Sequence, residues 1–314
     1  MLIEDSEGSV VAIDLGSNSF HLLEAKLSSS GKLHAVNARA HKVQLGLDMV
    51  DRQLSASAIQ RGLACIQQFS SYTQGRNPAC VKVVGTQALR LATNKQDFIV
   101  PASEMLGQPI NIVSGEEEAC LAYTGVAAEL TGSAMRLVID VGGGSTEFGL
   151  GRGVQFISGL SVAVGCVSWL QYFQQGVISA DSLACAQQAA SEEFARILPV
   201  LAKSGSAGPA LRESAQFAVG CSGTLQAVEQ VLTQQRWSVG GITRQGLERL
   251  KQALLNFDSI DAVSFQGLRE ERRSIFATGV AIVLALFEVF QFQSVRLSSA
   301  GLREGIAWQL LHPG

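Results

Sequence analysis

The chain has 314 residues, of which 47% are hydrophobic, and its formal net charge is −3. This length is sufficient for two domains with separate cores, and the hydrophobic content argues against disorder. A charge close to neutral gives no electrostatic footprint for nucleic acid, so we expect no nucleic-acid partner. A polyanionic ligand would need a local basic patch, backbone amides or a metal.

The cysteines and the apolar segments indicate a cytoplasmic protein that does not bind membranes. The six cysteines form no Cys-x-x-Cys pair and no cluster with zinc-ligand spacing, which favours free thiols. Residues 1–8 include three acidic residues, unlike a signal peptide. The most apolar segment, residues 274–287, is shorter than the ~20 residues of a membrane span and predicts a buried helix.

The first half of the chain predicts a hairpin followed by alternating helices and strands. Apolar runs and helical spacing place a hairpin at 9–26, strands at 34–44, 81–84 and 110–113, and helices at 55–72, 86–92, within 93–106, and from 114 to about 129. The segment 131–133 is the expected domain junction.

The second half predicts the same order of elements. It has a hairpin at 136–151, strands at 155–160, 217–219 and 294–298, and helices at 164–173, 180–203, after 224, at 243–256, 270–289 and 302–310. Two halves of one order imply two α/β domains of one topology.

Two glycine-rich turns look like copies of each other. Asp14 is followed by Leu-Gly-Ser-Asn-Ser, and Asp140, 126 positions later (140 − 14), by Val-Gly-Gly-Gly-Ser. Such a turn presents backbone N–H groups and hydroxyls that can hold a phosphate, and the aspartate can hold a hard cation or a water. Two of them suggest two similar half-molecules acting on one polyanionic ligand.

Six segments together resemble one enzyme family, the exopolyphosphatase and guanosine pentaphosphate phosphohydrolase (Ppx/GppA) family. They are AIDLGSNSFHLL, VVGTQALRLATN, IVSGEEEA, LVIDVGGGSTE, GCSGTLQA and AGLREG, and they extend from about residue 10 to residue 306. The chain departs from the family pattern at Ser299, where an Asp is common.

The resemblance implies two actin-like, ribonuclease-H-like domains of the ASKHA superfamily with the site in an interdomain cleft. We expect domain I at 1–130, domain II at 131–301, and the final helix, about 302–314, packed back on domain I. The chain resembles the short, two-domain form of the family, and a homodimer is expected. The implied reaction is Mg²⁺-dependent hydrolysis of the terminal phosphoanhydride of inorganic polyphosphate, or of guanosine pentaphosphate, the alarmone of the stringent response.

Glu118 and Arg90 are the first catalytic candidates. Ser114 and Glu117 form a capping box, which explains the neighbouring acidic residues as a well-capped helix. Glu118 instead shares a stripe with the apolar face of this helix, and it matches the family's catalytic glutamate, so we predict a general base. By resemblance, Arg90 neutralises charge on the phosphoryl group; the alternative is a solvated helix residue.

The remaining candidates surround the glycine-rich turns. By resemblance, Asp14 and Asp140 hold magnesium directly or through water, although either could be a turn-stabilising residue. Glu147 is a further catalytic carboxylate that positions water or metal. The predicted phosphate-binding residues are Ser17, Asn18, Ser19, Gly143, Gly144, Ser145, Thr146, Gly220, Ser222, Gly223 and Thr224.

Two further features are interpreted as structural. The charged run 269–273 is typical of a solvated helix start, and His21 lies on an alternating strand.

Two alternative functions also stay open at this point. One is a noncatalytic sensor of polyphosphate or alarmone, and the other is a small-molecule kinase of the same superfamily.

Overall fold

The computed structural model describes residues 8–47, 49–76, 78–203 and 218–313. It divides into two compact units, one of Met1–Thr131 with Ala300–Gly314, and one of Gly132–Ser299. The sequence placed this division after residue 130 and assigned the final helix to the first domain. Within the described ranges, no helix combines the length and the apolar character needed to cross a membrane.

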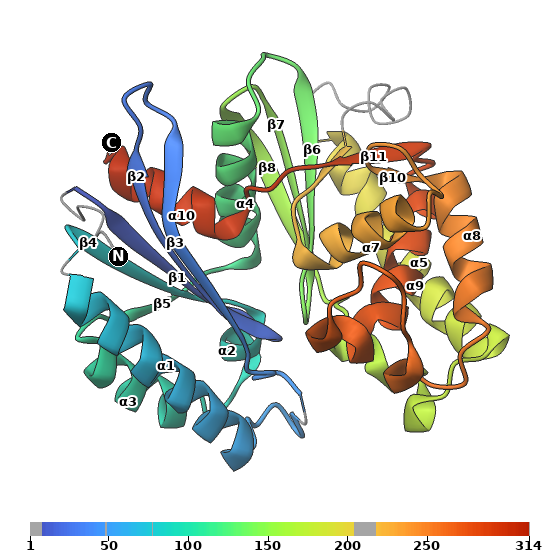
Figure 1. Ribbon diagram of the computed structural model, residues 1–314, viewed down its shortest axis with the longest axis horizontal. Helices are drawn as coiled ribbons and strands as arrows, with labels where there is room; N and C mark the ends of the chain where they lie inside the picture. Colours follow the sequence, from blue (N-terminus) through green and yellow to red (C-terminus); the bar gives the residue numbers. More distant parts are fainter. Residues whose placement is uncertain (1–7, 48, 77, 204–217, 314) are drawn as a thin grey trace. The chain divides into compact units, whose positions relative to one another are not determined.

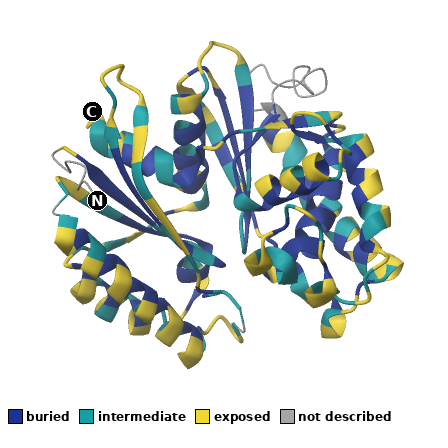
Figure 2. Ribbon diagram, viewed as in Figure 1, coloured by how far each residue is buried: buried dark blue, intermediate teal, exposed yellow. Residues whose placement is uncertain are grey.

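Unit 1 is built on a mixed five-stranded sheet. The strand order is β3-β2-β1-β4-β5, with β1 to β3 antiparallel and β4 and β5 parallel to β1. The strands are β1 (Val10–Leu15), β2 (Ser19–Leu27), β3 (Leu33–Lys42), β4 (Cys80–Gly85) and β5 (Ile110–Ile112). The central strand β1 is almost wholly buried, whereas the edge strand β3 is largely exposed (Figure 2).

Helices cover both faces of the unit 1 sheet (Figure 1). On one face, α1 (Ala56–Arg76) and α3 (Gln96–Leu106) pack on the side chains of Ile13 and Phe20. On the other, α4 (Gly115–Glu129) and α10 (Leu302–Leu311) pack on Ala12 and Leu23. The short α2 (Gln87–Leu91) follows β4. Because side chains alternate along β1, Asp14 shares the face of Ala12 and so lies on the α4 and α10 side.

Helices α4 and α10 touch backbone to backbone. A Cβ added to Gly125 would lie 2.0 Å from the carbonyl oxygen of Gly301, and one added to Gly305 would lie 1.9 Å from that of Leu121. Any larger residue at either glycine would force the helices apart. The close approach therefore fixes the position of α10 on unit 1.

Unit 2 contains a mixed six-stranded sheet. Its order is β10-β11-β9-β6-β7-β8, with β6 to β8 antiparallel and β9 and β11 parallel to β6. The strands are β6 (Met135–Val141), β7 (Thr146–Arg152), β8 (Gln155–Val162), β9 (Ala218–Gly220), β10 (Ile242–Thr243) and β11 (Ser294–Leu297).

The two sheets repeat one topology. Without the edge strand β10, the order β11-β9-β6-β7-β8 matches β5-β4-β1-β2-β3 strand for strand. The hairpins also agree in register. Asp14 pairs with His21 and Asp140 pairs with Glu147. The corresponding residues of the two hairpins are 126 positions apart in both cases (140 − 14 and 147 − 21). Even the register shift against the third strand recurs, between Glu24 and Ala25 and between Leu150 and Gly151.

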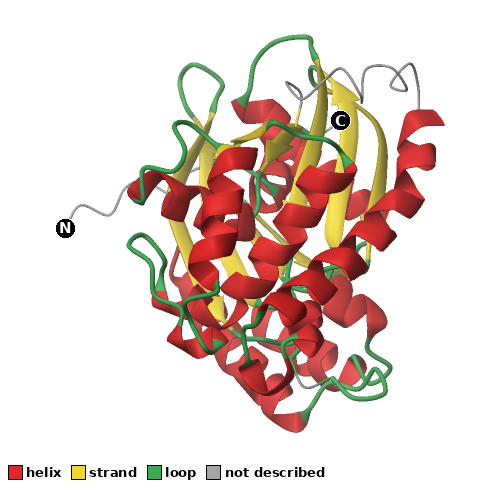
Figure 3. Ribbon diagram, turned by 90° about the vertical axis from the view of Figure 1, so that its right-hand side faces the viewer, coloured by secondary structure: helices red, strands yellow, loops and turns green. Residues whose placement is uncertain are grey.

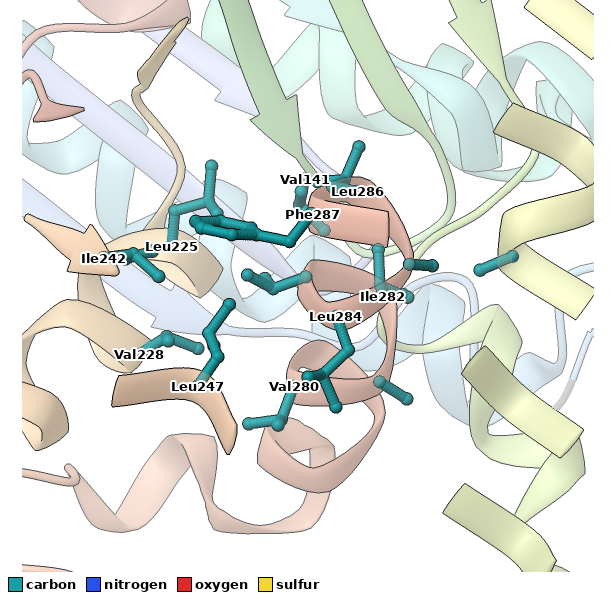
Figure 4. Close-up of a cluster of buried hydrophobic side chains, with 14 of the residues drawn as sticks. Val141, Leu225, Val228, Ile242, Leu247, Val280, Ile282, Leu284, Leu286 and Phe287 are labelled. Carbon is teal, nitrogen blue, oxygen red and sulfur yellow. The ribbon is translucent and has the colours of Figure 1, made fainter. Parts of the chain in front are cut away.

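The core of unit 2 forms around a helix that is buried on nearly every side. This is α9 (Arg273–Val289), which packs against α5 (Ala180–Lys203), α7 (Gly223–Gln234) and α8 (Arg244–Leu254). The ring of Phe287 extends from α9 toward Leu225 of α7, with Leu247 of α8 close by (Figure 4). Both units combine helices and strands, which confirms the predicted α/β class (Figure 3).

Two predicted elements need correction, and one strand is missing from the predictions. Residues 164–173 form only a 3₁₀ helix, η1 (Ser168–Tyr172), because the amides of residues 166–168 bind carbonyls of a neighbouring turn instead of a helix. The helix expected at 270–289 begins with a separate 3₁₀ turn, η4 (Glu270–Arg272). Strand β10 is absent from the predictions, because two residues are too short to show a period, and the predicted strand residue Phe217 lies outside the described residues.

Candidate active site

The first glycine-rich turn connects β1 to β2 and is held from one side. The amide of Gly16 donates to the carbonyl of Ser19 across the turn, at 3.2 Å. The carbonyl of Ser17 accepts from Gly46 at 2.9 Å, and that of Asn18 accepts from Val43 and Gln44 at 3.1 and 2.7 Å. The segment 43–46 thus satisfies the carbonyl groups of the turn.

The opposite side of this turn presents hydrogen-bond donors. Within the described residues, the amides of Ser17 and Asn18 donate no hydrogen bond. Asn18 is 8% exposed, and its buried Oδ1 has no partner among those residues, while its Nδ2 donates to the Ser19 hydroxyl at 3.1 Å. Consecutive amides of this kind form a concavity suited to an anion.

The second turn has the same construction. Gly142 donates to the carbonyl of Ser145 at 2.8 Å. The carbonyl groups of Gly142 and Gly143 accept from the amides of residues 166–168 at 2.7–3.2 Å, and that of Gly144 accepts from the Ser168 hydroxyl at 3.2 Å. For the part of the chain that the structure describes, the amides of Gly143, Gly144 and Ser145 make no hydrogen bond. These three predicted phosphate-binding residues therefore share one donor surface.

Thr146 has a different role from the one predicted. Its side chain is fully buried, and its hydroxyl donates to the carbonyl of Val164 at 2.6 Å. Because that hydroxyl has only one proton, it cannot also donate to a phosphate. Thr146 instead anchors the segment that backs the turn.

Glu118 lies near the start of α4, on the face predicted from its spacing. The capping box is present: the Ser114 hydroxyl accepts from the amide of Glu117, and the Glu117 carboxylate accepts from that of Ser114, which lowers the pKa of Glu117. Glu118 is 9% exposed, whereas the neighbouring Glu116 and Glu117 are exposed. A carboxylate buried on an apolar face needs a polar partner.

Arg90 supplies that partner from the C-terminal part of α2. Its Nη1 donates to the carbonyl of Val113 at 2.7 Å and to Oε2 of Glu118 at 3.2 Å. The guanidinium is thereby held in place by Val113, which follows β5, and by Glu118 of α4, which excludes the alternative of a solvated helix residue. The structure brings the predicted pair of Glu118 and Arg90 into direct contact.

The carboxylates at the strand ends pair differently in the two units. Asp14 is half-buried and stands opposite His21, whereas Asp140 is half-buried and stands opposite Glu147. Glu147 is 2% exposed, and its Oε1 accepts from the Ser161 hydroxyl at 2.8 Å. Directly opposite residues on antiparallel strands have Cβ atoms about 5 Å apart.

The pair in unit 2 fits a magnesium ion in type and number of ligands. Within the described ranges, no three or more His, Cys, Asp and Glu side chains gather into a metal site. Magnesium does not require such a group, because it keeps several waters and uses one or two carboxylates together with phosphate oxygens. Asp140 and Glu147 can provide that small oxygen set.

The third glycine-containing turn precedes α7, and its two hydroxyl groups have partners within unit 2. The Ser222 hydroxyl caps the helix by accepting from the amide of Leu225 at 3.2 Å. Thr224 is buried, with its hydroxyl 3.7 Å from the sulfur of Cys166. Gly220 belongs to β9. Of these four predicted residues, Gly223 is the one that lies beside a positively charged group.

That group is the guanidinium of Arg272, a residue of the charged run 269–273 that the sequence predicts to be solvated and that the structure shows half-buried. A Cβ on Gly223 would lie 2.0 Å from its Nη2, so only glycine leaves room for the guanidinium. Burial lowers the pKa of Arg272, and the neighbouring Cys166, Glu271 and Asp140 oppose that shift. A cation against a helix N-terminus is unfavourable unless an anion joins them, so a bound anion would stabilise this contact.

One signal in the sequence pointed to this residue. Arg272 and Arg273 stand at the N-terminus of the apolar helix 274–287, where the helix dipole disfavours cations. Their partner could not be found in the same way, because Gly223 lies 49 positions away (272 − 223).

Comparisons with known proteins concern the family and the fold of this chain. The sequence model of the Ppx/GppA phosphatase family matches residues 26–313. An exopolyphosphatase from Cytophaga hutchinsonii is 20% identical with a TM-score of 0.81, covering 96% of this chain and 97% of that one. The Ppx/GppA family member of Aquifex aeolicus is 22% identical with a TM-score of 0.74, covering 96% and 97%. At these identities the likeness establishes the shared fold, which is of the predicted α/β class with two units.

Proposed function

Because the chain belongs to the Ppx/GppA phosphatase family, we propose that it hydrolyses the terminal phosphoanhydride of inorganic polyphosphate and releases orthophosphate. Guanosine pentaphosphate, which would give the tetraphosphate, is the second candidate substrate. The observation that carries the proposal is the buried Glu118 held by Arg90 at 3.2 Å.

Glu118 is the proposed general base. A buried carboxylate at the start of α4, held by Arg90, is suited to accept a proton from a water. Arg90 positions this carboxylate through Nη1, and its other N–H groups are suited to an oxygen of the transferred phosphoryl group. Such a base contributes about 10²- to 10⁴-fold to a rate.

The glycine-rich turns are the proposed phosphate sites. The amides of Ser17 and Asn18 in unit 1, and those of Gly143, Gly144 and Ser145 in unit 2, would donate to nonbridging oxygens. Arg272 and the N-terminus of α7 would bind a further phosphate group. Donors fixed before the reaction stabilise developing charge without reorganisation, which is the main contribution expected in phosphoryl transfer.

Magnesium is the proposed cofactor, held at Asp140 and Glu147, with Asp14 as a further ligand either directly or through water. The ion would neutralise phosphate charge and polarise the bond to be broken. Glu147 is kept in place by a hydrogen bond from Ser161. The thiol of Cys221 lies 3.8 Å from the carboxylate of Asp140.

A phosphate-release assay tests the proposal. Polyphosphate of several chain lengths and guanosine pentaphosphate are each incubated with the protein, with Mg²⁺ and with chelator. We expect Mg²⁺-dependent orthophosphate release from the end of the chain, and loss of release in Glu118→Gln but not in the exposed control Glu116→Gln. Binding of either ligand without release would support the noncatalytic sensor instead.

A further inference from the structure

The two hairpins agree in register but differ at the residue opposite the strand-end aspartate. Unit 2 has Glu147 there, and unit 1 has His21, at the same offset of 126 positions (147 − 21). A histidine in the place of a carboxylate changes what the neighbouring aspartate can contact, because an imidazole can donate a hydrogen bond.

The tautomer of His21 follows from its neighbour. Nη1 of Arg303, on α10, lies 3.5 Å from Nδ1 of His21. A guanidinium has only donors and stays protonated, so Nδ1 must be the acceptor. The contact therefore favours the tautomer of His21 that carries its hydrogen on Nε2.

Arg303 is held where this contact needs it. Its helix touches α4 through Gly301 and Gly305, so α10 cannot shift without a backbone clash. Arg303 is half-buried, and its Nη2 lies 3.5 Å from Glu304, whose carboxylate also accepts from the amide of Gly301 at 2.7 Å. The contact joins the first turn of α10 to the turn end of the first hairpin.

Asp14 is the neighbour that the Nε2–H group can serve. It stands directly opposite His21 on the adjacent strand, on the same face of the sheet, where Cβ atoms are about 5 Å apart. We propose that Arg303 and His21 are positioning residues: Arg303 fixes the imidazole so that Nε2–H donates to the carboxylate of Asp14 and orients it toward the reaction centre. The inference rests on the proposed function for the role of Asp14, although the tautomer does not depend on it.

Three variants separate this role from simple packing. His21→Gln places an amide N–H near the position of Nε2, whereas His21→Asn places its amide near Nδ1. Arg303→Met keeps the length of the side chain and removes the donor. We expect His21→Asn and Arg303→Met to lower kcat about 10- to 100-fold, the usual effect of losing an outer-shell partner, with KM for polyphosphate within about twofold. His21→Gln should restore most of kcat, and combining Arg303→Met with His21→Asn should add little.

A second readout needs no activity and no metal. The ¹⁵N NMR spectrum of the histidine ring should show a protonated Nε2 and an unprotonated Nδ1 for His21 in the wild type, and a mixture of tautomers in Arg303→Met. Thermal unfolding of each variant verifies that it folds. If Arg303→Met does not fold, the comparison of His21→Gln with His21→Asn still decides the role.

The outcomes distinguish the two proposals. Equal kcat in His21→Gln and His21→Asn, or an unchanged tautomer in a folded Arg303→Met, would overturn the positioning role. No phosphate release by the wild type from any substrate would overturn the proposed function, while the NMR result would still decide how Arg303 sets the tautomer.

Discussion

The hairpins of the two units have the same backbone pairing, but the side chains in the row that includes the strand-end aspartate differ. In unit 1 the row across three strands is Asp14, His21 and Ala40, and in unit 2 it is Asp140, Glu147 and Ser161. The first row contains one carboxylate with an imidazole beside it, and the second contains two carboxylates and a hydroxyl. The common backbone thus supplies the two turns that we propose bind phosphate, while the side chains favour the unit 2 turn as the proposed cation site.

The helices that follow the last strand of each repeat also begin alike and then differ at one position. α4 follows β5 and α10 follows β11, and each has a glutamate at its third residue, Glu117 or Glu304, that accepts from the amide of the N-cap residue. The next residue is Glu118 in α4 and Gly305 in α10. One repeat carries the candidate base, and the other uses a glycine to bring two helices together.

The largest effect should come from removing that base. Glu118→Gln keeps the size of the side chain and its contact with Arg90, but it removes the proton acceptor. We expect kcat for phosphate release to fall about 10²- to 10⁴-fold, with little change in KM. Steady-state kinetics on polyphosphate measures both values. A Glu118→Gln protein with wild-type kcat would mean that the two repeats do not differ in this function.

The next effect concerns the two rows of side chains. Glu147→Gln should raise the Mg²⁺ concentration for half-maximal activity at least about tenfold, because a carboxylate of the proposed ion site is lost. Ser161→Ala removes one hydrogen bond to that carboxylate, worth about 1 kcal/mol, so its effect should be roughly fivefold. Mg²⁺ titrations of activity measure the two shifts. Equal Mg²⁺ requirements in the wild type and Glu147→Gln would contradict the assignment of the ion to unit 2.

A smaller effect on KM should distinguish the two segments that pack behind the turns, one with Gly165 and the other with Gly46. A Cβ on Gly165 would lie 2.4 Å from backbone atoms of Gly144, whereas one on Gly46 would lie 3.2 Å from the side chain of Ser17. Gly165→Ala must therefore displace the turn backbone, at about 1–3 kcal/mol, and raise KM for polyphosphate. Gly46→Ala, the matched control, should leave KM nearly unchanged. The comparison fails if the two alanine variants behave alike.

Local patterns in the sequence predicted the hairpins, the capping box and the burial of Glu118. Each depends on residues within a few positions of one another, where a period of two or of 3.6 is visible. The repeat itself was found because the spacing between copies is constant over the hairpin. The family resemblance then supplied the roles of Arg90, Asp14 and Asp140.

Contacts between distant segments could not be predicted. The carbonyl groups of the second turn are bound by residues 166–168, which a helical pattern placed in a helix. Arg272 meets Gly223 because two helices begin at the same place, and neither sequence shows this alone. Such contacts depend on tertiary packing. The interdomain cleft, the homodimer and the magnesium ligands stay predictions of the resemblance.

The last effect concerns stability and not activity, and it arises at the far end of the same hairpins. Glu24 of unit 1 corresponds to Leu150 of unit 2 (150 − 24 = 126), and it is fully buried. Burial raises the pKa of Glu24, but hydrogen bonds from Tyr72, Ser9 and Arg76 outweigh it and hold the pKa below its usual value.

A carboxyl with a lowered pKa in the folded state stabilises that state above its unfolded pKa, and the contribution is lost as the pH falls. Glu24→Gln should therefore destabilise unit 1 by about 1–3 kcal/mol at pH 7, and less below about pH 4. Hydrogen exchange of the β2 amides measures the change, with the β7 amides of unit 2 as an internal control. If β2 and β7 lost protection equally, or if the loss did not shrink with acid, the buried carboxylate would not be the specific support of unit 1 that its hydrogen bonds indicate.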